Sequence, residues 1–125
     1  MTITESIVKA LENSFPDMQT YYGLVPRTDE ELAKEKWDYF IVRRASLGKS
    51  ASAAIDFSRR YAVTIIMEDT IPEGFELEVI DTITGSYPGL RLADGTFDYD
   101  YITKNKSNTR VEFLTLYFSR TLKKA

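Results

Sequence analysis

One segment of the sequence alternates apolar and polar side chains with a period of two, and this pattern constrains the fold more than any other feature. Successive side chains of a β-strand point to opposite faces of its sheet, so a long alternation predicts one long strand with a buried face. The segment runs from about Ala53 to Glu68, and its more apolar set consists of Ile55, Phe57, Arg59, Tyr61, Val63, Ile65 and Met67.

The segment before it, residues 37–46, has the same period of two. A strand that is apolar on both faces is typical of the middle of a sheet or of an interface. The loop between the two strands, Leu47–Ser52, contains glycine, serine and lysine, so we expect a long hairpin. Trp37, Tyr39 and Ile41 share one face of the earlier strand, with Phe40 and Val42 on the other.

Two other segments have the period of an amphipathic helix. Residues 3–14 are expected to form the first helix, because Thr2 and Glu5 have the spacing of a capping box and Pro16 ends it. Residues from about 72 to 84 are expected to form the second, since Pro72 suits a first turn and Gly85 a helix end. The expected core residues of these helices include Ile7, Leu11, Phe75, Val79 and Ile83.

The remaining segments predict a second hairpin and some loops. Residues 97–101 and 111–118 alternate with a period of two on either side of a polar turn at 104–108, and Leu90 and Leu92 are compatible with a short strand. Tyr21–Gly23 is interpreted as a loop, and residues 29–36 as at most a short exposed helix.

The order of these elements is α-β-β-α-β-β. It predicts a single α+β domain over residues 1–125. Two hairpins bridged by a helix most easily make one mainly antiparallel sheet of four principal strands, with the two helices packed on a face of that sheet.

Histidine and cysteine are both absent from the sequence. Their absence removes the commonest general base, the soft metal ligands and any disulfide framework. We therefore expect no enzyme activity and no metal or organic cofactor. The remaining active-site candidates are the carboxylate pairs Glu68–Asp69 and Asp98–Asp100. We interpret the first as favourable charge at the start of the second helix and the second as a solvated strand face.

Two basic spots flank the predicted hairpin loop, at Arg43–Arg44 and at Arg59–Arg60. In a hairpin they can form a positive stripe beside Tyr39 and Tyr61, a pattern that nucleic-acid binders also use. The net charge of −3 favours ordinary surface, so no specific nucleic-acid partner is expected. The candidate interaction residues are Arg43, Arg44, Gly48, Lys49, Ser50, Arg59 and Arg60.

No apolar run approaches the roughly 20 residues that span a bilayer, and the first residues lack the basic and apolar regions of a secretory signal. We therefore expect a soluble cytosolic product without a membrane partner.

Several short segments come in an order that resembles a known family. They resemble the small minor-capsid or tail-completion proteins that long-tailed phages and prophages of Gram-positive bacteria encode between their head and tail genes. The resemblance covers most of the chain. The segments that carry it are Tyr21-Tyr22-Gly23-Leu24, Trp37-Asp38-Tyr39-Phe40-Ile41-Val42-Arg43-Arg44, Ile71-Pro72-Glu73-Gly74, Pro88-Gly89-Leu90-Arg91-Leu92 and Val111-Glu112-Phe113-Leu114-Thr115-Leu116.

The resemblance implies a tail-terminator-like fold and a structural role in the virion, as a tail terminator, head–tail joining protein or minor capsid component of the phage neck. It implies self-assembly into a ring, hexameric in tail terminators, that docks on tail-tube or connector proteins and can depend on that partner to form. The protein would then occur in the host cytoplasm during assembly and afterwards in the neck or tail of the virion.

Two other functions remain open. The first is a monomeric α+β ligand-binding or regulatory module that uses the tyrosine-rich face of the sheet. The second is an enzyme with a carboxylate site, which the missing histidine and cysteine disfavour.

Overall fold

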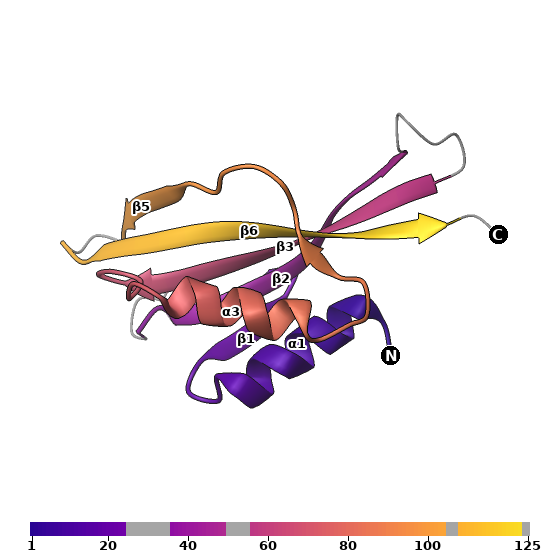
Figure 1. The fold of residues 1–125 in the computed structure, drawn as a ribbon. Coiled ribbons are helices and arrows are strands. Elements are labelled where there is room, and N and C mark those ends of the chain that lie inside the picture. The colour runs from indigo at the N-terminus through magenta and orange to yellow at the C-terminus, as the bar shows by residue number, and fades with distance from the viewer. Residues whose placement is uncertain (25–35, 50–55, 105–107, 124–125) are drawn as a thin grey trace.

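The computed structural model describes residues 1–24, 36–49, 56–104 and 108–123. They form an α+β fold in which a six-stranded mixed sheet carries the helices α1 and α3 on one face (Figure 1). The strand order is β1-β2-β3-β6-β4, and β5 also pairs with β6. The predicted α+β class and the mainly antiparallel sheet are confirmed, since β1–β2 is the one parallel pair among the described strands, but the sheet has six strands where four principal ones were expected.

Helix α1, Ile3–Ser14, has the bounds that the sequence predicts. The hydroxyl of Thr2 accepts the backbone N–H of Glu5 at 3.1 Å, which satisfies one of the otherwise unpaired donors at the start of a helix. The helix ends where the N–H of Phe15 bonds to the carbonyl of Leu11, directly before Pro16. Its buried side chains are Ile3, Ile7 and Leu11.

Strand β1, Gln19–Tyr22, lies in the segment that was expected to be a loop. It runs parallel to β2, Asp38–Lys49, with Gln19 opposite Tyr39 and Tyr22 opposite Val42. The loop prediction was wrong because a four-residue strand is too short to display a period of two. The glycine that suggested a turn lies just beyond it: Gly23 has φ of 83°.

The centre of the sheet is built by three long strands. β3, Asp56–Glu68, pairs antiparallel with β2 on one side and with β6, Arg110–Lys123, on the other. The β2–β3 hairpin is therefore confirmed. Two short strands, β4 (Arg91–Leu92) and β5 (Tyr99–Thr103), share the outer side of β6.

Helix α3, Phe75–Thr84, begins later than the predicted residue 72. Gly74 stands before it with φ of 93°, a left-handed conformation that glycine adopts without strain. Residues 71–74 are instead used to enter the helix, since the N–H of Phe75 bonds to the carbonyl of Pro72. Val79 and Ile83 are fully buried as predicted, and Phe75 is half-buried.

The core lies between the helices and one face of the sheet. Phe40 on β2, Ile65 on β3 and Leu114 on β6 are register partners, so their side chains share that face. Ile7, Leu11, Val79 and Ile83 cover it from the helices. The opposite face carries apolar side chains that neither α1 nor α3 covers, among them Tyr39, Ile41, Ile66, Phe113 and Tyr117.

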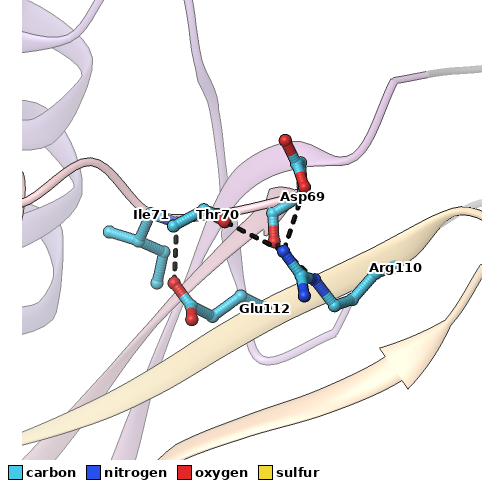
Figure 2. A network of polar contacts seen from close by, with 5 residues as sticks. All are labelled: Asp69, Thr70, Ile71, Arg110 and Glu112. Atoms are coloured by element: carbon cyan, nitrogen blue, oxygen red, sulfur yellow. Dashed lines mark hydrogen bonds and ion pairs between the residues drawn. The ribbon is translucent and has the colours of Figure 1, made fainter.

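Side chains of β6 form hydrogen bonds and an ion pair with the turn between β3 and α3 (Figure 2). Arg110 contacts the carboxylate of Asp69 at 3.1 Å and the hydroxyl of Thr70 at 3.3 Å, while Glu112 accepts the N–H of Ile71 at 2.7 Å. Asp69 has φ of 70°, a conformation that only a minority of non-glycine residues adopt.

The neighbouring Glu68 forms an ion pair with Lys104 and accepts the N–H of Trp37 at 2.9 Å. The interpretation of Glu68–Asp69 as charge for the second helix was therefore wrong. These carboxylates tie strands and a turn together, and the acids in the first turn of α3 are Glu76 and Glu78.

Several predicted segments include residues outside the described ranges, among them residues 53–55 of the second predicted strand and 105–107 of the predicted turn. The exposed helix expected within residues 29–36 lies outside the described residues except for Lys36, and so does Ser50 of the hairpin loop.

Candidate interaction site at the end of the long strands

The strands β2, β3 and β6 continue past the helices at the end of the sheet nearest the start of α1 (Figure 1). A pocket of about 870 Å³ opens there between the sheet and α1. Its strand wall carries Arg44, Arg59 and Arg120, and its helix wall includes Ile3, Glu5, Val8 and Glu12. We call it the arginine pocket.

Strand register brings the arginines of this pocket together. Arg44 lies opposite Tyr61, and Arg59 lies opposite Arg120, so these side chains share the face that the helices cover further along. Like charges directly opposite each other on neighbouring strands are unfavourable. Arg44, Arg59 and Arg120 concentrate positive charge in the pocket, and the pairing of Arg59 with Arg120 lowers the stability of the fold.

Arg120 is fixed by its neighbours. Its Nε donates to the carbonyl of Pro88 at 3.0 Å, and its guanidinium lies 5.1 Å from the centre of the Tyr87 ring. Arg44 and Arg59 differ, because neither guanidinium forms a hydrogen bond or ion pair with another residue that the structure describes. These two cations are therefore available to a group from outside the described chain.

The helix wall of the pocket is acidic. Glu5 and Glu12 line it from α1, and within the described ranges neither carboxylate comes within ion-pair distance of a pocket arginine. Apolar side chains lie between the two charged walls, with Ile3 and Val8 on the helix and Leu122 on β6. A guest that fits this pocket has negative charge on one side and an apolar surface on the other.

The sequence-predicted arginines divide between the two faces of the sheet. Arg44 and Arg59 enter the arginine pocket, whereas Arg60 lies on the opposite face, 5.3 Å from the centre of the Tyr117 ring. Arg60 also lines a smaller pocket of about 290 Å³ that contains Arg91 and Asp94. The expectation of a single stripe is not met, because adjacent residues of a strand point to opposite faces.

The other candidate residues lie further along β2. Arg43 is exposed opposite Ala62, on the face of Arg60. Gly48 and Lys49 are exposed opposite Ser58 and Phe57. The two tyrosines of the expected stripe also lie on different faces of the sheet. Tyr61 lines the arginine pocket, and Tyr39 lies on the other face, opposite Ile66.

Sequence reasoning missed Arg120 and Tyr87. The alternation of β6 continues to Arg120 and places it on the same face as Phe118 and Leu116. That signal was available, but its meaning depends on the pairing of β3 with β6, which no local pattern specifies. Tyr87 follows α3 in a turn, where periodicity gives no information.

The carboxylate candidates have structural surroundings. Asp98 and Asp100 are exposed, and Asp98 precedes β5. Tyr99 donates to Glu76 at 3.0 Å, and partial burial together with this acceptor raises the pKa of the Tyr99 hydroxyl. A hydrogen bond to Glu112 raises the pKa of Tyr101. In the described parts of the chain, no three acidic side chains are grouped to hold a metal ion.

Comparison with known proteins adds no relative. No protein-family model matches the chain, and no curated protein matches it either. Among the described residues, neither helix is long and apolar enough to cross a membrane.

Proposed function

We propose that the protein is a structural subunit of a phage neck, a tail terminator or head–tail joining component that assembles into a ring and docks on tail-tube or connector proteins. The observation that carries the proposal is the set of long strands that pass the helix layer and present Arg44 and Arg59 without a partner among the described residues. The resemblance of the chain's short segments to tail-completion proteins supports the same class.

The geometry suits a subunit that works by contact. Arginine is enriched at protein interfaces, where its guanidinium pairs with carboxylates through two hydrogen bonds. The face of the sheet opposite α1 and α3 also carries half-buried apolar side chains, among them Tyr39, Ile41 and Tyr117, and apolar side chains are common in the centre of protein interfaces. A subunit that works through such contacts needs a rigid sheet and neighbouring subunits, and it needs no catalysed reaction.

The proposed role fixes where the protein acts. Subunits accumulate in the host cytoplasm during assembly and become part of the neck or tail of the virion, where the ring joins tail to head.

A complementation experiment tests this function. A lysogen whose prophage lacks the gene is supplied with the wild-type protein, with the Arg44→Glu/Arg59→Glu variant, or with the control Lys9→Glu, an exposed lysine of α1 outside the pocket. We expect electron microscopy to show separate heads and tails without the gene and with the double variant, and joined particles with the wild type and the control. Normal virions in the absence of the gene would overturn the proposal.

The arginine pocket itself favours a second candidate, a monomeric ligand-binding or regulatory module. Its volume of about 870 Å³ lies within the range of about 300–1,000 Å³ that is usual for small-molecule sites. A module of this kind predicts that anionic compounds raise the melting temperature of a monomer and that deletion of the gene leaves head–tail joining intact.

A further inference from the structure

We propose that the arginine pocket receives the outer face of helix α3 from a second copy of the chain. The inference rests on the proposed function, because it names the contact by which a ring of subunits would form. In this contact one subunit provides the pocket and its neighbour provides the helix, so the two partners use different surfaces.

Charge is separated along the sheet. Six of the eight arginines of the sequence belong to strand positions at the end that carries the pocket: Arg43, Arg44, Arg59, Arg60, Arg91 and Arg120. Acidic residues are concentrated on α3 and on the turns at the opposite end of β3 and β6, and Glu5, Glu12 and Asp94 are the acids that line the pockets at the basic end. A molecule with one basic end and one acidic side is electrostatically complementary to another copy of itself.

The outer face of α3 is the acidic surface that best matches the pocket. Leu77 is 63% exposed, the largest exposed apolar side chain of the helix, and Glu78 and Asp81 beside it are exposed too. Leu77 and Asp81 are one turn apart and therefore share a face. The helix contains no lysine or arginine. We call Leu77, Glu78 and Asp81 the α3 knob.

The α3 knob has both properties of a guest that fits the pocket, negative charge and an apolar side chain. Its carboxylates can pair with Arg44 and Arg59, which have no partner among the described residues, and so relieve the repulsion between Arg59 and Arg120. Leu77 can enter the apolar floor formed by Ile3, Val8 and Leu122. An exposed leucine is common on protein surfaces, but here it lies beside the two carboxylates that the pocket attracts.

The acidic helix wall sets the orientation of the contact. Glu5 and Glu12 repel carboxylates, so the incoming helix is rotated with Glu78 toward the strand wall and Leu77 on the side nearer α1. The pocket and the α3 knob share no residue, so one subunit can use both at once. A contact of this kind repeats from subunit to subunit and closes into a ring when the rotation permits.

The test uses purified full-length protein and sedimentation velocity at concentrations up to about 1 mM, at ionic strengths of about 0.01 M and 0.1 M, where the Debye lengths are about 30 Å and 10 Å. The pocket variant is Arg44→Glu/Arg59→Glu, the knob variant is Leu77→Ser/Glu78→Ser, and the control is Asp98→Ser, an exposed acid outside both surfaces. Arg59 is half-buried and the other substituted residues are exposed, so circular dichroism melting checks that each variant folds.

We expect the wild type and the control to form oligomers that weaken at the higher ionic strength, and each double variant to be monomeric. An equal mixture of the two variants should form heterodimers and nothing larger, because it contains one intact pocket and one intact knob per pair. A wild type that stays monomeric at the highest concentration, a variant that assembles normally, or a mixture that stays monomeric overturns the inference.

The outcomes separate this contact from the proposed function. Heterodimers together with normal virions from the gene-deleted prophage would support the contact and refute the neck function. Monomers in solution, with joined particles restored by both double variants and absent without the gene, would support the neck function and refute the contact.

Discussion

Glu112 is the buried carboxylate on which the entry to α3 depends, and its replacement by leucine should destabilise the fold. The side chain is only 5% exposed and faces the helix layer. It accepts the N–H of Ile71 at 2.7 Å in a buried position (Figure 2) and a hydrogen bond from the hydroxyl of Tyr101. Leucine has a similar size but no acceptor, so the N–H of Ile71 is left buried and unpaired.

The magnitude follows from the groups that lose a partner. A buried donor without an acceptor costs about 1–3 kcal/mol, and leucine offsets part of this because it removes a buried charge. We expect Glu112→Leu to lower the free energy of unfolding by about 2 kcal/mol. At about 3–6 °C per kcal/mol for a domain of this size, the melting temperature should fall by about 6–12 °C. Glu112→Gln, which keeps a carbonyl acceptor, should lose about half as much.

Thermal melting followed by circular dichroism measures the effect at neutral pH. The matched control is Glu78→Leu, because that carboxylate is exposed and lies outside the contacts between β6 and the turn that leads into α3; its melting temperature should stay close to that of the wild type. A Glu112→Leu variant that melts within about 1 °C of the wild type would show that the N–H of Ile71 does not need this acceptor.

Three further predictions concern the stability of the fold. Leu11→Asp or Val79→Asp should prevent soluble folding, because each buries an unpaired charge at a cost of several kcal/mol; wild-type-like melting of either would contradict the assigned core. Asp69→Val should lower stability by about 1–2 kcal/mol in urea unfolding, since a β-branched residue is strained at φ of 70°, whereas Asp69→Asn should lose less. Burial alone raises the pKa of Glu68, but the hydrogen bonds from Lys104 and from the backbone of Trp37 outweigh it and hold the pKa below the ordinary value of a glutamate. Glu68 therefore stabilises the fold above its unfolded pKa and loses this effect as the pH falls through the folded value, so Glu68→Gln should flatten the acid limb of the stability curve.

Periodicity predicted the elements that are long. Residues 3–14 have the full pattern of an amphipathic helix, and the alternation through residue 68 identified β3 and its buried face. The four residues of β1 gave no period, and their parallel pairing depends on β2, which lies beyond an intervening segment of the chain. Local sequence cannot specify such a partner.

The arginine pocket was predictable only in part. Arg44 and Arg59 were identified as neighbours because a hairpin brings its two strands together. The period of two also places Arg60 on the opposite face of the sheet from Arg59, so this separation could have been predicted from the sequence. The contribution of Arg120 was not, because it requires the pairing of β3 with β6 across about fifty residues of chain, as between Ile65 and Leu114.

That pairing has a consequence for synthesis of the protein. A ribosome releases α1, β1, β2 and β3 well before β6, the strand that occupies the place beside β3 in the sheet. At about 5–20 residues per second, the roughly fifty residues between paired positions such as Ile65 and Leu114 take about 3–10 s to appear. During that interval the edge of β3 and its apolar side chains are open to other nascent chains on the same message. Slower translation of residues 69–110 should therefore increase aggregation of the newly made protein, and a chaperone that shields the strand edge should reduce it.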